Sequence, residues 1–237
     1  MSRTRDKLIL SALLPALVLA GCTAPAARSA AGTAASTSAS GDIPSPTPPS
    51  GFVATVSPAT PADVAKSWRP GCPVGPDQLD LLTLSYRGFD GQPHIGTIVV
   101  RRTVTDDVIS VFTALYDARF PIRRMTPVDH YDGDDDRSMA DDNTSGFNCR
   151  DAVTDGPSGW SAHAYGEAID VNPVENPYLV DGRVLPPAGA AYADRKVDHP
   201  GLAVPDGVLV KAFASVGWQW GGTWRSPDYQ HFSRDGG

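Results

Sequence analysis

Between residues 23 and 61 the chain is built almost entirely from Ala, Ser, Thr, Pro and Gly, with few large apolar side chains. Such a segment cannot bury enough apolar surface to offset the entropy that it would lose on ordering. We therefore expect residues 22–62 to be a disordered tether, partly flexible and partly extended. The globular fold is then confined to residues 63–237, which we expect to form a single domain because they contain no second linker and no repeat.

The start of the chain has the pattern of a bacterial lipoprotein signal. A positively charged segment over residues 3–7 precedes an apolar run over residues 8–20, which is too short to span a bilayer comfortably. The run closes with Leu19-Ala20-Gly21-Cys22, which resembles a lipobox,. We expect residues 1–21 to be a removed signal peptide, and a lipid on Cys22 to hold the protein at the extracytoplasmic face of the bacterial cell membrane. An ordinary signal peptide cut nearby, with Cys22 incidental, is the alternative.

Charge is divided unevenly along the chain. The sequence holds 20 basic residues (Lys and Arg) and 27 acidic residues (Asp and Glu). Only four of the basic residues and two of the acidic residues precede residue 63. Residues 63–237 therefore carry 16 basic and 25 acidic groups, a net charge of −9. We expect no nucleic-acid partner, because phosphate binding needs a basic footprint, and we expect a monomer. An anionic substrate also gains no long-range attraction, so a local Arg must meet any substrate carboxylate.

The cysteine count agrees with export. If Cys22 is lipidated, Cys72 and Cys149 remain, and an even remainder in an oxidising compartment indicates one disulfide,. Two buried free thiols are the alternative.

The hydrophobic patterns of residues 63–237 predict an α+β domain. Alternating strands over residues 79–86 and 95–101 flank a turn at Asp90-Gly91 and suggest a hairpin,. Amphipathic helices are expected from Thr105 to just before Pro121 and over residues 206–216. Shorter strands are expected over residues 122–128, 147–151, 168–172, 218–224 and 229–233. Because strands and helices do not alternate regularly, we expect a central antiparallel sheet with flanking helices.

Two groups of chemistry-bearing residues, far apart in the sequence, together offer the ligands of a metal site. Catalytic zinc sites use three protein ligands, and two imidazoles with one carboxylate suit Zn²⁺. His163 precedes a glycine turn, and Asp170 lies in a predicted strand between core residues, where an unpaired carboxylate would be costly,. Asp228, three residues before His231, can lie beside the metal as a general base. Chance placement of structural residues is the alternative.

These residues fall into two spaced motifs. The first is Ser-x-His-x-x-Gly-x-Ala-x-Asp, from Ser161 to Asp170, and the second is Asp-x-x-His-Phe, from Asp228 to Phe232. Together the motifs resemble the VanY-type D-alanyl-D-alanine carboxypeptidases and the related L-alanyl-D-glutamate endopeptidases. Those proteins are zinc peptidases of bacterial cell walls and share a fold with the Hedgehog signalling domain. The resemblance implies one Zn²⁺ held by His163, Asp170 and His231, with Asp228 as the catalytic base.

The same resemblance implies an Arg upstream of the first His, near the scissile carbonyl. Arg150 is the candidate, either to stabilise the oxyanion or to grip a substrate carboxylate, and Arg137 is the runner-up. The alternative for Arg150 is a surface side chain paired with a neighbouring acid. Ser161 is expected either to hydrogen-bond the substrate or to cap a turn.

We therefore expect an exported, membrane-tethered zinc peptidase that hydrolyses peptidoglycan stem peptides as a D-alanyl-D-alanine carboxypeptidase. An L-alanyl-D-glutamate endopeptidase of the same family is the first alternative, because the depth of the substrate pocket cannot be read from the sequence. A non-catalytic, zinc-stabilised cell-wall binding module is the second. That module would predict a missing base, whereas Asp228 is present.

Overall fold

The computed structural model describes residues 51–153 and 159–236, and its longest strands form the predicted hairpin. β2 (Leu79–Arg87) and β3 (Pro93–Arg101) pair antiparallel along their whole length. The turn between them includes Gly91 at φ 73°, a left-handed conformation that glycine adopts without strain,. The hairpin is confirmed, with each strand slightly longer than predicted.

A third strand precedes the predicted start of the folded part. β1 (Ala54–Pro58) pairs antiparallel with β2 over all of its residues, so the predicted tether over residues 22–62 extends too far. β1 is an edge strand with mostly exposed side chains, and main-chain hydrogen bonds to β2 hold it,. The composition of the long tether hid the strand-forming residues in and just before β1, which are Phe52, Val53 and Val56. The predicted signal peptide, Cys22 and the tether up to residue 50 lie outside the described residues.

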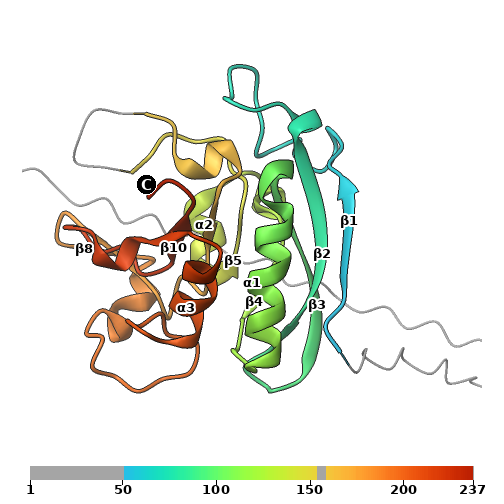
Figure 1. Ribbon diagram of the computed structural model, residues 1–237. Helices are drawn as coiled ribbons and strands as arrows, with labels where there is room; N and C mark the ends of the chain where they lie inside the picture. Colours follow the sequence, from blue (N-terminus) through green and yellow to red (C-terminus); the bar gives the residue numbers. More distant parts are fainter. Residues whose placement is uncertain (1–50, 154–158, 237) are drawn as a thin grey trace, which may run out of the picture. The chain divides into compact units, whose positions relative to one another are not determined.

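Helix α1 (Thr105–Asp117) begins where predicted and lies across one face of this sheet (Figure 1). Asp106 and Asp107 in its first turn complement the positive end of the helix dipole,. On its other side α1 packs against α3 (Val208–Ser215), the second predicted helix. The buried face of α1 is formed by Val108, Val111, Phe112, Leu115 and Tyr116.

A second antiparallel sheet, in the order β6-β10-β9, is assembled from parts of the chain that are distant in sequence. β6 (Ala168–Asp170), β9 (Gln219–Trp220) and β10 (His231–Ser233) are shorter than the predicted strands that contain them. After β9 the chain turns into a 3-10 helix, η6 (Gly221–Thr223), which ends the predicted strand over residues 218–224 early. This sheet carries the site described below.

Residues 147–151 do not form the strand that was predicted for them. Successive N–H groups of this segment bond to three different parts of the fold: Phe147 to the carbonyl of Val99, Asn148 to that of His163, and Cys149 to that of Ser67. A ladder needs one continuous partner, so none forms here. Asn148 and Asp151 are also residue types that are depleted in strands,. The segment instead connects the first sheet to the site region.

The α+β prediction is confirmed, although two three-stranded antiparallel sheets take the place of one central sheet. A parallel pair, β4 with β5, and an antiparallel pair, β7 with β8, complete the described strands. The remaining elements are β4 (Arg124–Met125), β5 (Asn143–Thr144), β7 (Tyr178–Val180), β8 (Arg183–Leu185), α2 (Asp135–Ala140), and the 3-10 helices η1 (Pro76–Gln78), η2 (Arg102–Val104), η3 (Val128–Tyr131), η4 (Ala162–Tyr165) and η5 (Pro187–Tyr192). Among the described helices, none has the length and apolar character needed to cross a membrane.

The predicted disulfide is present. Cys72 and Cys149 are joined, with Cα atoms 5.9 Å apart and a sequence separation of 77. The bridge ties the segment before β2 to the residues that lead into the site. It lies beside a small hydrophobic cluster that includes Val64, Leu79 and Phe147.

Replacing Cys72 with Ser is expected to destabilise the protein under oxidising conditions. The chain-entropy model gives an upper value of about 4.5 kcal/mol in the free energy of unfolding for a loop of this length,. Urea unfolding measures the loss, and Cys149→Ser is expected to produce a similar one. Thiol titration in denaturant should find one more free thiol than in the parent chain, and no gain in thiol would contradict the bridge.

A buried pair of carboxyl groups lies outside the predicted site. Glu175, in the loop between β6 and β7, is 2% exposed, and its neighbour Asp142 accepts a hydrogen bond from Val174 N–H at 2.8 Å. Burial, followed by the hydrogen bond and charge of Asp142, raises the pKa of Glu175 to about 8. Arg123 is half exposed and lies 3.8 Å from Glu175, so its charge offsets the rise in this pKa only in part.

Replacing Glu175 with Gln is expected to change how stability depends on pH. The folded state favours the protonated carboxyl, so the stabilising contribution of Glu175 is present below pH 4.5 and is lost as the pH rises to about 8,. Glutamine mimics the protonated form at every pH. The variant should therefore melt about 3 °C above the parent at pH 8.5, with the gap closing by pH 5. Melting curves that run parallel across this range would contradict the assignment.

Candidate metal and catalytic site

Strand register brings Asp170 and His231 face to face. Asp170 ends β6, His231 begins β10, and the two residues are direct partners in the antiparallel ladder. Side chains of directly opposed residues project from the same face of a sheet. The carboxylate and the imidazole therefore meet, although 61 positions separate them in the sequence.

His163 reaches the same point from the 3-10 helix η4. Ser161 begins this helix, and its Oγ accepts a hydrogen bond from His163 N–H at 3.3 Å. Gly166 ends the helix with φ 68°, and a Cβ there would lie 2.7 Å from the backbone nitrogen of Arg101. Only glycine satisfies both the left-handed turn and the close approach. Of the two roles considered for Ser161, the structure shows the turn cap.

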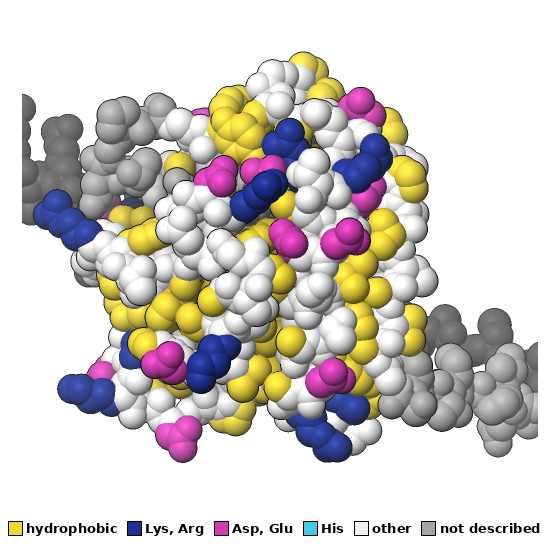
Figure 2. Space-filling view, in the orientation of Figure 1, with side chains coloured by type: hydrophobic (Ala, Val, Ile, Leu, Met, Phe, Trp, Pro, Cys, Tyr) yellow, Lys and Arg dark blue, Asp and Glu magenta, His cyan; other side chains and the backbone are white. Residues whose placement is uncertain are grey.

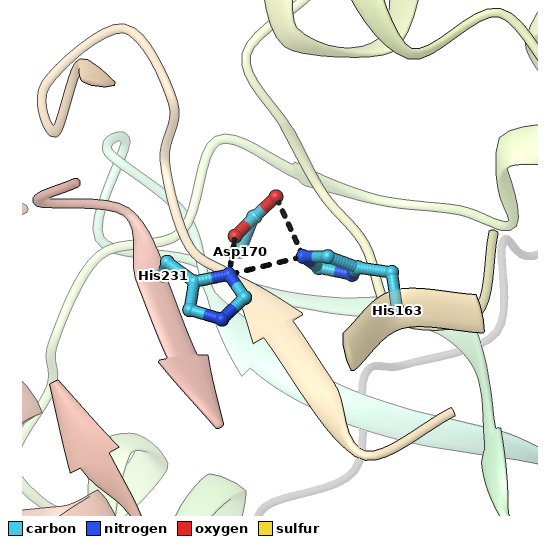
Figure 3. Close-up of side chains that lie close together, drawn as sticks. All are labelled: His163, Asp170 and His231. Atoms are coloured by element: carbon cyan, nitrogen blue, oxygen red, sulfur yellow. Dashed lines mark hydrogen bonds and ion pairs between the residues drawn. The ribbon is translucent and has the colours of Figure 1, made fainter. Parts of the chain in front are cut away.

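The three predicted ligands converge on one point (Figure 3). His163 Nε2 lies 3.1 Å from Asp170 Oδ2, and His231 Nδ1 lies 3.1 Å from Asp170 Oδ1. The two ring nitrogens are 3.2 Å apart. The exposed fractions of His163, Asp170 and His231 are 2%, 3% and 6%. Three polar groups so well shielded from water must satisfy one another or hold a common cation.

A hydrogen bond to Gly146 selects the atom of His163 that faces the cluster. Nδ1 of His163 lies 2.7 Å from the carbonyl oxygen of Gly146, and because that oxygen only accepts, Nδ1 donates,. In the neutral ring Nε2 then presents a lone pair to the Asp170 carboxylate and to Nδ1 of His231. Lone pairs that converge this closely repel unless a proton or a metal cation lies among them. Two imidazoles and one carboxylate, one ring oriented by a backbone carbonyl, form a donor set that fits Zn²⁺,.

The electrostatics of the cluster are consistent with a cation site. Burial raises the pKa of Asp170, but the charge and hydrogen bond of His163, with those of His231, outweigh burial and hold this pKa below its ordinary value. Burial lowers the pKa of His163, and the neighbouring Asp170 more than compensates, so this pKa is raised. The surroundings therefore keep Asp170 ionised and favour positive charge beside it.

Asp228 lies next to the cluster in the turn before β10. Its backbone N–H donates to the carbonyl of Gly221 at 3.0 Å, which holds the turn. Within the described part of the chain, its buried Oδ1 has no hydrogen-bond partner. Burial, followed by the charge of Asp170, raises the pKa of Asp228 to about 7. A carboxyl group with a pKa near neutrality can both accept and return a proton during a reaction.

The structure places Arg150 in the site and leaves Arg137 outside it. Nε of Arg150 forms an ion pair of 2.9 Å with Oδ2 of Asp135, in the first turn of α2. Arg137 pairs instead with Asp132, and both of these side chains are more than half exposed. Sequence reasoning missed Asp135, because it stands in a run of acidic residues with no spacing that distinguishes it.

The cluster opens into a cavity of about 500 Å³, a volume that suits a short peptide,. Aromatic side chains form part of its wall, and the ring centroids of Trp224 and His231 are 5.2 Å apart. Arg225 also lines the cavity and was missed from the sequence, because an exposed Arg in a loop produces no pattern. The predicted site residues in the wall are Arg150, Ser161, His163, Asp228 and His231.

Comparison with known families agrees with the motifs. Residues 154–234 match the family model described as D-alanyl-D-alanine carboxypeptidase. This range contains all three converging side chains and Asp228, so the resemblance read from the two motifs is confirmed over these residues. No curated protein and no solved structure matches the chain.

Proposed function

We propose that this protein is an exported, zinc-dependent peptidase that removes the terminal D-alanine from peptidoglycan stem peptides. The observation that supports this function is the buried convergence of His163, Asp170 and His231, with Asp228 in the same cavity. The family match over these residues indicates a peptidase of the D-alanyl-D-alanine carboxypeptidase type. Zinc, the stem-peptide substrate and export are the parts that we add.

The metal would be held by Nε2 of His163, Nδ1 of His231 and the carboxylate of Asp170. When bound there, Zn²⁺ supplies Lewis-acid chemistry, which polarises a carbonyl and makes water a better nucleophile near neutral pH. The chain contributes a rigid frame for this group. Ladder pairing holds Asp170 against His231, and the carbonyl of Gly146 orients the ring of His163,.

Asp228 is the general base in this proposal. Its buried Oδ1 lacks a protein partner among the described residues, so it is available to accept the proton of the attacking water. The same carboxyl then returns the proton to the leaving amine. Burial raises the pKa of Asp228 above its ordinary value, and a carboxylate with a raised pKa is a stronger base for the proton of the attacking water,.

Arg150 supplies positive charge to the wall of the same cavity. Its guanidinium lines the cavity and is oriented by Asp135. A guanidinium in that position stabilises the oxygen that gains negative charge when water attacks the scissile carbonyl. The neighbouring disulfide at Cys149 limits the movement of this segment.

The proposal includes a location. A lipid on Cys22 and the low-complexity residues that follow would hold the peptidase at the outer face of the cell membrane, within reach of the wall. Radiolabelled fatty acid incorporated by the parent chain and not by Cys22→Ser would support this anchoring. Equal labelling of the two chains would contradict it.

Mass spectrometry of muropeptides incubated with the full chain tests the activity. Samples with zinc, with a chelator, and with zinc restored after chelation are compared. Chelator-sensitive loss of one alanine from a pentapeptide supports the carboxypeptidase. A chelator-sensitive cut between L-Ala and D-Glu would instead identify the endopeptidase of the same family. No cleavage by a folded, zinc-loaded chain would contradict both and favour a binding module.

A further inference from the structure

Arg225 is a cationic side chain of the cavity wall that has no role in the chemistry described so far. It is exposed and lines the same cavity as His163, Asp228 and His231. Within the described residues its guanidinium has no ion pair and no hydrogen bond. An unpaired guanidinium in a cavity wall is ready to bind an anion, because no internal partner has to be displaced first.

The other charged side chains of the cavity wall are acidic or already paired with an acid. Arg150, the second Arg of the wall, is already paired with Asp135. Asp136 and Asp228 add further acidic groups to the wall. On the one face of the molecule that Figure 2 shows, acidic and basic side chains are interspersed rather than gathered in a patch of one sign. Of the two Arg side chains that line the cavity, Arg225 is the one left unpaired among the described residues and thus available to a substrate carboxylate.

The loop that carries Arg225 is fixed close to the reacting groups. Trp224 N–H and Asp228 N–H both donate to the carbonyl of Gly221 at 3.0 Å, and Leu179 N–H donates to the carbonyl of Pro227 at 2.8 Å. Arg225 thus stands between two anchored residues, one of which is the proposed base. In a peptide that loses its last residue, the terminal carboxylate lies only one residue beyond the scissile carbonyl. Its partner must therefore belong to the immediate surroundings of the base, as Arg225 does.

We propose that Arg225 binds the free C-terminal carboxylate of the substrate and so selects the terminal peptide bond over an internal one. This inference rests on the proposed peptidase function and assigns its specificity to one side chain. A guanidinium can take both oxygens of a carboxylate in a bidentate contact. The neutral C-terminal amide of the same peptide, or a chain that continues past the cleaved bond, offers no such charge.

The test compares two synthetic peptides that end in D-Ala-D-Ala, one with a free carboxyl group and one with a C-terminal amide. The full chain with zinc is expected to cleave the free acid with a kcat/KM about tenfold higher than the amide, which is the low end for hydrogen bonds to a charged group. Arg225→Gln should remove this preference by raising KM for the acid, while the rate on the amide stays unchanged. Arg225→Lys should restore part of the preference, since it keeps the charge without the bidentate geometry.

Arg183→Gln is the matched control. Arg183 lies in β8, pairs with Asp181 and does not line the cavity. The Arg183→Gln variant should keep the parent's preference for the free acid over the amide. Equal cleavage of the acid and the amide by the parent chain would overturn the proposal. An equal fold loss of kcat/KM on the acid and on the amide in Arg225→Gln would overturn the proposal as well.

A binding measurement separates this inference from the proposed function. N-acetyl-D-Ala-D-Ala and its amide are titrated into the full chain carrying Asp228→Asn, with tryptophan fluorescence as the readout. The acid is expected to bind about tenfold more tightly than the amide, and Arg225→Gln should abolish the difference. If the parent chain cleaves no peptide, the proposed function fails, yet this titration still decides the role of Arg225. Equal binding of acid and amide would overturn it.

Discussion

Replacing Asp228 with Asn is expected to lower turnover of a stem pentapeptide by about 10³-fold while the chain keeps its bound zinc. Removal of a general base typically costs between about 10² and 10⁴ in rate. Asparagine has nearly the same shape, so the turn held by Gly221 should persist. The measurements are kcat on a defined peptide and metal content by elemental analysis of the same sample. A normal zinc content together with a collapsed kcat would separate the base from the ligands.

The control for Asp228→Asn is Asp132→Asn, which removes an equal charge from a residue outside the cavity wall. Asp132 pairs with Arg137 at the surface, so its loss should leave turnover within about twofold of the parent, in line with the small effects of exposed ion pairs. Undiminished turnover in Asp228→Asn would remove Asp228 from the mechanism. A loss of zinc in that variant would show that Asp228 contributes to metal binding instead.

Replacing Asp170 with Asn is expected to abolish zinc retention. The carboxylate lies 3.1 Å from a nitrogen of each His and is the anionic member of the donor set. Its neutral isostere removes the charge that favours a dication there, and two imidazoles alone are a poor zinc site. After dialysis the parent should hold one zinc per chain and the variant less than about a tenth of that. Chelator-sensitive activity should disappear with the metal.

Thermal unfolding gives a readout of the cluster that does not depend on activity. A ligand that binds only the folded state raises the melting temperature as its concentration rises. Added zinc should therefore stabilise the metal-free parent and leave Asp170→Asn unchanged. Glu175→Gln, which also neutralises a buried carboxyl, serves as the matched control and should keep the zinc response. Stoichiometric zinc in Asp170→Asn, or no zinc response in the parent, would contradict the metal site.

Features encoded in short stretches of sequence were predicted well. The hairpin of β2 and β3 follows from alternation around Asp90-Gly91, and the start of α1 follows from its acidic first turn. The disulfide followed from counting cysteines, since a single pair remains after Cys22. In each case the relevant information is local or leaves only one possible partner, so no knowledge of the packing was needed.

Features that depend on a distant partner were not predictable in the same way. β1 was missed because composition was judged over the whole of residues 23–61, although Phe52, Val53 and Val56 are strand-forming residue types,. Its partner, the edge of β2, is known only from the tertiary structure,. Residues 147–151 were predicted to form a strand, yet three of their N–H groups bond to three separate segments. Strand formation depends on where the partner lies, and only the tertiary structure supplies that.

In the site, too, some features could be read from the sequence and others depend on the tertiary structure. The candidate ligands His163, Asp170 and His231 and the candidate base Asp228 were proposed from the sequence alone, because two spaced motifs contain the residue types that a metal site needs. Their meeting depends on the pairing of β6 with β10. The sequence already ranked Arg150 above Arg137, and the structure places Arg150 in the cavity wall while Arg137 pairs with Asp132 at the surface. The position of Arg225 in the same wall emerged only in three dimensions. An Arg has no distinctive spacing, and its role is set by which acids and which cavity its flexible side chain can reach.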